Sequence, residues 1–331
     1  MAKELTAESK AYLLSIGSSG IDDRLIDEAW LTSATAGPGA GGRSFFLTSG
    51  PHRVRLSLNR NSPLKVIPSG SGVSVVKGDD IIATARLERP LCHCPKQAYI
   101  TISERCIHDC RFCPVPKLGG TVKDTGTIFR MVAGAYATGQ LESISLTSGV
   151  AESPEQEVKR TVGVVMALRE RYPLPVGVSV YPTATSSEDL AAAGADEIKY
   201  NVETMDPIIF SRVCPGLSLQ AILDALGDAV RVFGKNHVFS NMILGIGESD
   251  ECVIKGVETL AALGVIPVLR PISPSPLRAG DITVVRPSAE RLLSLGRKTK
   301  AILEKYNFNP REARTMCIPC TGCDITPFRD V

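Results

Sequence analysis

The residues best suited to chemistry are six cysteines, which form two triplets far apart in the chain. The stretch ERCIHDCRFCPVP holds the first triplet, with the spacing CxxxCxxC: Cys106, Cys110 and Cys113. The stretch TMCIPCTGCDITP holds the second, with the spacing CxxCxxC: Cys317, Cys320 and Cys323. Thiolates at such short spacings bind either zinc or the irons of a sulfide cluster. Each triplet is therefore a candidate metal site.

The first triplet favours an iron–sulfur cluster over zinc. A cubane normally takes four thiolates, so three from one loop leave one iron open to a substrate or cofactor. Zinc sites usually use CxxC pairs, whereas this triplet has a CxxxC step and an aromatic residue, Phe112, before its last cysteine. We therefore predict a [4Fe–4S] cluster on the first triplet.

The second triplet needs a fourth ligand. The stretch PLCHCPK offers Cys92 and Cys94, whose side chains share one face of an extended segment. We favour Cys94, with Cys92 and then His93 as alternatives, and with zinc as the alternative to an iron–sulfur cluster because CxxC pairs suit zinc. Cys214 and Cys252 stand alone in the sequence, and we expect both to be small buried apolar residues.

Composition restricts the class of protein. The chain has 331 residues, 44% apolar and 22% charged, which is typical of a soluble globular protein with a full core. The net charge of +2 gives no field for nucleic acid or an anionic membrane. The sequence shows neither a signal peptide nor a transmembrane segment. We therefore expect a cytoplasmic protein, in which cysteines are ligands rather than disulfides.

From about residue 96, short apolar strands alternate with helical patterns. Strands are predicted at 98–103, 143–148, 176–182, 197–204, 237–248 and 265–274. Repeated βα units predict an α/β fold with a parallel sheet, either doubly wound or a barrel. No GxGxxG follows the first strand, and polar residues gather where strands end, which favours a partial (β/α)6 TIM barrel over residues 96–287.

The flanking segments have different patterns. Residues 1–95 predict a helix at about 5–15, a flexible glycine-rich loop in TAGPGAGGRSFF, and a small extension of antiparallel strands. KGDD is a hairpin turn signal between the last two of these strands. Residues 288–331 predict a helix followed by the tail that carries the second cysteine triplet.

The CxxxCxΦC motif after the first barrel strand resembles the signature of the radical S-adenosylmethionine (SAM) superfamily, and the resemblance extends over residues 96–280. It implies a [4Fe–4S] cluster on Cys106, Cys110 and Cys113, whose open iron binds SAM. One electron, from a ferredoxin-type donor, would cleave SAM to methionine and a 5′-deoxyadenosyl radical. The cofactor carries this chemistry, and the protein positions it.

The same resemblance implies a set of SAM-binding residues at the strand ends. LTSGV replaces the usual glycine-rich end of the second strand, YNVET ends the fourth strand, and ILGIGE resembles the adenine-binding segment. Two arginines would bind the carboxylate of SAM or of a substrate. The implied cofactor-binding residues are Thr147, Ser148, Gly149, Asn201, Glu203, Arg212, Gly245, Gly247 and Arg270.

Two longer segments are similar to lipoyl synthases: YNVETMDPIIFSRVCPG and ILGIGESDECV. The layout also resembles biotin synthases, and both families insert sulfur into unactivated C–H bonds using an auxiliary cluster. Classical lipoyl synthases carry the auxiliary cysteines before the barrel, whereas this chain carries them in its tail. The resemblance is therefore to the split type, in which two radical SAM proteins cooperate.

This subtype implies an octanoyl-lysyl carrier domain or peptide as substrate and a second radical SAM component as partner. An apolar pocket would hold the alkyl chain, and the residues expected near strand ends are Val150, Val180, Tyr181, Met242 and Ile272. Two alternatives stay open. One is a radical SAM mutase, lyase, methylase or peptide-modifying enzyme that inserts no sulfur, and the other is a non-enzymatic iron–sulfur scaffold.

Overall fold

The computed structural model describes residues 4–331. Its first helix, α1 (Ala7–Ile16), starts at a capping box in which Thr6 and Ser9 satisfy each other's backbone amides, and it ends at Gly17 with φ 73°. Seven strands follow: β1 (Ser18–Ile21), β2 (Leu31–Ser33), β3 (Arg43–Ser49), β4 (His52–Leu58), β5 (Lys65–Ser69), β6 (Gly72–Lys77) and β7 (Asp80–Glu88).

These strands make a small barrel rather than the purely antiparallel extension that we predicted. Strand β1 pairs in parallel with both β4 and β5, whereas the other pairs are antiparallel. Because β3 also pairs with β7, hydrogen bonds run around the ring β3–β4–β1–β5–β6–β7 and back to β3. The predicted β6–β7 hairpin is present, with Lys77 opposite Asp80.

The predicted α/β barrel is confirmed. Six parallel strands lie in the order in which the chain forms them: β8 (Gln97–Thr101), β9 (Ser143–Thr147), β10 (Val176–Ser179), β11 (Glu197–Lys199), β12 (Val238–Leu244) and β13 (Ile266–Pro271). The sheet order is linear, so β8 and β13 are its two edges and the barrel is partial. The strands are buried on both faces, which explains their unbroken apolar runs.

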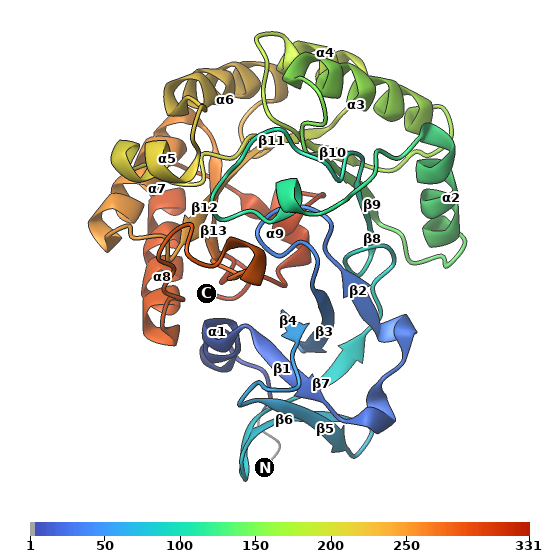
Figure 1. Ribbon diagram of the computed structural model, residues 1–331, viewed down its shortest axis with the longest axis vertical. Coiled ribbons are helices and arrows are strands. Elements are labelled where there is room, and N and C mark those ends of the chain that lie inside the picture. Colours follow the sequence, from blue (N-terminus) through green and yellow to red (C-terminus); the bar gives the residue numbers. More distant parts are fainter. Residues whose placement is uncertain (1–3) are drawn as a thin grey trace.

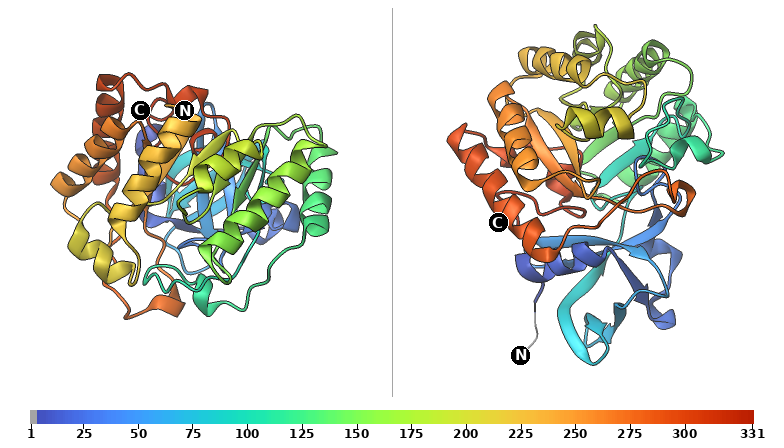
Figure 2. Two further views of the ribbon diagram at one scale, coloured as in Figure 1. Left: turned by 90° about the horizontal axis from the view of Figure 1, so that it is seen from above. Right: turned by 60° about the vertical axis from the view of Figure 1, so that its left-hand side comes forward.

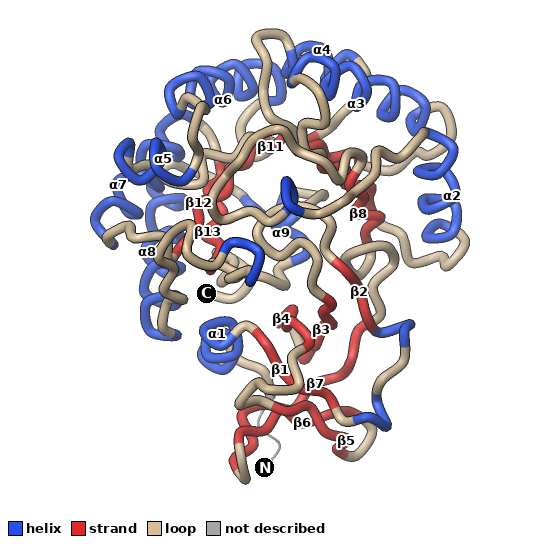
Figure 3. The backbone as a smooth tube through the Cα atoms, in the orientation of Figure 1, coloured by secondary structure: helices blue, strands red, loops and turns tan. Residues whose placement is uncertain are grey.

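Helices cover the outside of this sheet as an arc (Figures 1 and 3). They are α2 (Thr125–Tyr136), α3 (Pro154–Arg169), α4 (Ser186–Ala192), α5 (Pro207–Val213), α6 (Leu219–Phe233) and α7 (Asp250–Leu263). Within residues 4–331, no helix combines the length and apolar character needed to span a membrane.

The tail enters the barrel from the end where the strands begin. Helix α8 (Ala289–Lys305) packs against α1 and α7, and the chain then turns inward to α9 (Cys317–Cys320), which lies inside the arc of strands (Figures 1 and 2). Gln97, the first residue of β8, donates its side-chain N–H to the carbonyl oxygen of Met316 at 3.0 Å. Glu197, the first residue of β11, accepts the backbone N–H of Thr315 at 2.8 Å.

One glycine makes this entry possible. A Cβ atom on Gly177 of β10 would lie 2.0 Å from Oγ1 of Thr315, so only glycine leaves room for the tail. The tail therefore fills the lower end of the barrel.

Candidate functional site

A cavity of about 390 Å³ runs through the barrel and has cysteines of both triplets in its wall. The cysteines that line it are Cys106, Cys110, Cys113, Cys317, Cys320 and Cys323, together with Cys92, Cys94 and Cys214. All ten cysteines of the chain are free thiols, as the sequence predicted. The first triplet follows the end of β8, and the second enters with the tail at the opposite end.

Backbone contacts fix the loop that holds the first triplet. Arg111 donates its backbone N–H to the carbonyl of Val213 at the end of α5, at 2.8 Å. The buried guanidinium of Arg278 donates to the carbonyl of Cys113 at 2.7 Å and pairs with Asp109 at 2.6 Å. Burial raises the pKa of the Cys113 thiol to about 12. A metal centre would offset this cost because it binds the thiolate.

The end of β9 approaches this loop very closely. A Cβ atom on Gly149 would lie 2.2 Å from the carbonyl oxygen of Arg105, so the contact requires glycine. Ser148 accepts the backbone N–H of Ser103 at 2.9 Å and donates to the buried carboxylate of Glu157 at 2.5 Å. The structure thus places Thr147, Ser148 and Gly149 in the cavity wall beside the first triplet.

Asn201 and Glu203 also line the cavity, although the strand β11 ends before them. Glu203 has φ 60°, a left-handed conformation that is uncommon outside glycine and is often found at functional sites. Burial raises the pKa of Glu203 to about 7, against the opposing effects of Lys199 and of a hydrogen bond with Asn201. The two side chains meet, but through this irregular backbone and not through the alternation of an extended strand.

Three implied SAM-binding residues lie outside the cavity wall. The guanidinium of Arg212 is exposed and donates to the carbonyl of Ile246 at 3.2 Å. Gly245 and Gly247 have φ of 107° and 111°, and the carboxylate of Glu248 accepts the backbone N–H of Gly245 at 2.8 Å. These glycines shape the loop after β12, and their role toward SAM stays a prediction.

The second triplet meets Cys94, and not Cys92. Cys94 and Cys320 are buried, with 2% and 8% exposure, and a hydrogen bond between them raises the pKa of Cys94 and lowers that of Cys320 to about 6. Cys317 and Cys323 are close enough to raise the pKa of Cys94 further. The thiol of Cys92 instead points at the carbonyl of Met131 in α2, at 3.8 Å, and burial raises its pKa to about 11.

His93, the other alternative, packs its ring edge-on to Tyr99 with ring centroids 5.7 Å apart. Burial lowers the pKa of His93 to about 3, so the ring is neutral. It lines the cavity beside the second triplet.

Arg270 lies at the C-terminal end of β13, as expected, and its side chain contacts the second triplet. Its Nη1 atom is 3.3 Å from the sulfur of Cys317, and the buried Nζ atom of Lys199 is 3.6 Å from the same sulfur. Arg270 also lies 3.7 Å from Asp324 of the tail. The tail occupies the interior of the barrel, so an inward-facing residue of β13 meets the tail before it can meet a ligand at the mouth. Two cationic side chains therefore lie beside the sulfur of Cys317.

Sequence reasoning missed two parts of this wall. Cys214 is buried, as expected, but its thiol is hydrogen-bonded to Cys110 and borders the first triplet. The glycine-rich segment 33–39 also lines the cavity, and Thr35 donates its hydroxyl to Oγ1 of Thr101 at 2.8 Å. A lone cysteine and a loop without a recognised motif gave no signal. Cys252 is only half-buried, on α7.

The two sets of thiols differ in the number of ligands that they could supply. In residues 4–331, no three histidine, cysteine, aspartate or glutamate side chains converge as one metal ion would require. The thiolates of a cubane bind separate irons and need no such convergence. The four thiols of the second set supply the ligand number that a cubane takes, and the three of the first set leave one position open.

The family model of the radical SAM superfamily matches residues 100–260. This chain carries a radical SAM domain. The domain contains the first triplet, Ser148, Gly149 and the YNVET segment, and it indicates an enzyme that uses a [4Fe–4S] cluster and SAM. No curated protein matches the chain significantly.

Solved structures share the fold at low sequence identity. A radical SAM methyltransferase from Sphaerobacter thermophilus is 17% identical, with a TM-score of 0.51 over 85% of this chain and 76% of the other. A methylornithine synthase is 15% identical, with a TM-score of 0.50 over 66% and 73%. An [FeFe]-hydrogenase maturase from Carboxydothermus hydrogenoformans is 15% identical, with a TM-score of 0.53 over 63% and 52%, so only about half of that chain is matched. These similarities concern the fold.

Proposed function

We propose that this radical SAM enzyme inserts sulfur into an unactivated C–H bond and takes the sulfur from an auxiliary [4Fe–4S] cluster. The observation that carries the proposal is the single cavity lined by both sets of thiols. A cluster that only relayed electrons would have no need to face the substrate chamber. A sulfur donor must face it, because the carbon that loses hydrogen has to reach the sulfur.

In this proposal Cys106, Cys110 and Cys113 hold the first cluster, which with SAM supplies a 5′-deoxyadenosyl radical when both are bound. The chain positions this group and excludes water. Arg278 locks the cysteine loop to the segment after β13, and Gly149 lets the end of β9 approach that loop.

Cys94, Cys317, Cys320 and Cys323 would hold the auxiliary cluster. Four thiolates bring four negative charges into a buried place, which is costly without cations nearby. Lys199 and Arg270 stand at the sulfur of Cys317 and offset part of that charge. The positive charges of Lys199 and Arg270 therefore support the proposal of a thiolate-ligated cluster beside Cys317.

The substrate that we propose is an octanoyl chain on a lysine of a carrier domain. Val150, Val180 and Tyr181 line the cavity, as a pocket for an alkyl chain requires, whereas Met242 and Ile272 lie in the core outside it. One auxiliary cluster would supply one sulfur per chain, so a second radical SAM component would add the other. A ferredoxin-type protein would donate the electron.

A single turnover tests the proposal. The anaerobic protein, with about eight irons for two cubanes, is mixed with SAM, a reductant and an octanoyl-lysyl peptide. We expect a peptide heavier by one sulfur atom and the loss of about four irons per chain. Cleavage of SAM with both clusters intact and no sulfur gained would refute sulfur insertion and favour a radical SAM enzyme of another reaction class.

A further inference from the structure

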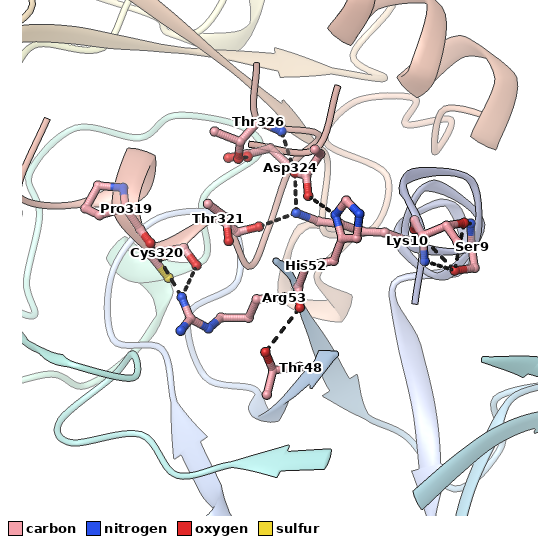
Figure 4. Close-up of polar contacts among 12 residues, drawn as sticks. Ser9, Lys10, Thr48, His52, Arg53, Pro319, Cys320, Thr321, Asp324 and Thr326 are labelled. Carbon is pink, nitrogen blue, oxygen red and sulfur yellow. Dashed lines mark hydrogen bonds and ion pairs between the residues drawn. The ribbon is translucent and has the colours of Figure 1, made fainter. Parts of the chain in front are cut away.

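The tail loop that carries Cys320 and Cys323 is hydrogen-bonded to the N-terminal segment. The backbone N–H of Arg55 in β4 donates to the carbonyl of Gly322 at 2.6 Å. The guanidinium of Arg53 donates to the carbonyl of Cys320 at 2.8 Å and reaches that of Pro319 at 3.5 Å (Figure 4). A backbone amide and a side chain of β4 thus fix the backbone of the tail from Cys320 to Gly322.

A buried lysine from α1 holds the same loop from its other side. Lys10 has no exposed surface, and its Nζ atom donates to the carbonyl of Thr321 at 2.6 Å (Figure 4). The same atom donates to the carboxylate of Asp330 at 2.5 Å. A buried charge is tolerated only where it is paired and hydrogen-bonded. The buried ammonium group of Lys10 therefore depends on the tail, because Thr321 and Asp330 supply its hydrogen-bond acceptors.

Asp330 closes the network around the loop. Its carboxylate accepts the backbone N–H of Thr326 at 2.8 Å and is 2.8 Å from Nδ1 of His52 on β4. Lys10 and Asp330 therefore tie the segment after Cys323 to the segment before it. The ends of the loop cannot separate while this pair is intact.

Apolar packing completes the contact on the N-terminal side. Phe46 of β3 packs with Cys94 and Cys320 in a small buried cluster of its own. A Cβ atom on Gly322 would lie 2.7 Å from the ring of Phe46, so the loop is pressed against this strand. By contrast, Cys317 meets the barrel residues Lys199 and Arg270.

We propose that the N-terminal segment is the platform that positions the auxiliary cluster, and that Lys10 is its central positioning residue. Without Lys10, Thr321 and Asp330 lose their common partner, and the thiols of Cys320 and Cys323 no longer hold a fixed distance from Cys94 and Cys317. This inference rests on the auxiliary cluster of the proposed function. It gives residues 4–88 a role in cofactor assembly that the radical SAM domain at 100–260 does not contain.

The experiment compares the full-length protein with Lys10→Met after anaerobic reconstitution. We expect the Lys10→Met protein to bind about four irons per chain, whereas the unsubstituted protein binds about eight. The electron paramagnetic resonance signal of the auxiliary cluster should be lost. Reductive formation of 5′-deoxyadenosine should stay within about twofold of the original rate, because Lys10 contacts nothing in the first site. Arg53→Met should shift or remove the same signal, and Arg53→Lys, which keeps a donor for the carbonyl of Cys320, should restore it in part.

Arg297→Met is the matched control, since it removes a surface cation that pairs with Glu8 of α1 at 3.1 Å. If the unsubstituted protein binds only about four irons, the auxiliary cluster itself is refuted. If it binds about eight, and Lys10→Met and Arg53→Met keep about eight with an unchanged signal, the platform is refuted while the cluster stands. Should Lys10→Met not fold, Arg53→Met decides, because its side chain is partly exposed.

Discussion

Cys94, just before the first strand of the barrel, is hydrogen-bonded to Cys320 in the last helix of the chain. Through this contact the segment between β7 and β8, which links the two barrels, meets the tail inside the radical SAM domain. It assembles a four-thiol set that no single segment of the sequence contains. The contact also distinguishes Cys94 from its neighbour Cys92, whose thiol faces α2 and not the tail.

The first prediction follows from this difference between Cys94 and Cys92. Cys94→Ala should remove one ligand of the auxiliary cluster, and the anaerobic protein should bind about four irons in place of about eight. Cys92→Ala is the matched control and should keep about eight, because its thiol points at the carbonyl of Met131. Iron and sulfide analysis measures both. Equal iron content in the two variants would contradict the assignment of Cys94.

The second prediction separates the two thiol sets by their chemistry. Replacing any one of Cys106, Cys110 and Cys113 by alanine should abolish reductive formation of 5′-deoxyadenosine, because the first cluster loses a ligand. Chromatography of the nucleoside products measures this. Cys252→Ala, on α7 and outside the cavity wall, is the control and should leave the rate unchanged.

Removing the three tail cysteines together should have the opposite outcome. SAM cleavage should persist while sulfurated peptide disappears and about four irons are lost. Loss of one zinc ion with no loss of iron would instead establish a structural zinc site in the tail.

The third prediction concerns the cations at Cys317. Lys199→Met or Arg270→Met removes a positive charge and an N–H donor from beside the sulfur, which disfavours the more negative reduced cluster. The reduction potential of the auxiliary cluster should become more negative by tens of millivolts in either variant. Redox titration followed by electron paramagnetic resonance measures it.

Lys123→Met provides the control, because Lys123 lines the same cavity but pairs with Glu104 beside the first triplet. Its auxiliary potential should match that of the unsubstituted protein. A shift of the same size in all three variants would show a general effect of cavity charge and not a specific one at Cys317.

The parts of the molecule that sequence could predict are those set by local periodicity and spacing. Six strands alternating with helices gave the barrel, and CxxxCxxC gave the first triplet. The predicted strand ends were less accurate. Strand β11 ends at Lys199, although an isolated bridge pairs Glu203 with Met242, and Glu203 has a positive φ. No local sequence pattern predicts a positive φ at a glutamate.

The parts that it could not predict depend on contacts between distant segments. The sequence places the tail after a helix, but it does not show that the tail then enters the barrel from the end where strands begin. The contact of Arg270 with Cys317 followed from that entry, as did the pairing of Cys94 with Cys320. The parallel pairing of β1 with β4 and β5 is likewise non-local, since antiparallel hairpins are what short alternating runs predict.

The last prediction tests the entry of the tail through Gly177. In Gly177→Ala the new methyl group would lie 2.0 Å from Oγ1 and 2.7 Å from Cβ of Thr315, so the tail has to move away from β10. Overpacking of this kind costs about 1–3 kcal/mol, and we expect a lower midpoint of thermal unfolding together with a weaker auxiliary-cluster signal. Gly163→Ala in α3, where no atom lies within 4 Å, is the control and should leave stability equal or higher because alanine favours helix. An unchanged midpoint and signal in Gly177→Ala would mean that the tail does not occupy the base of the barrel in solution.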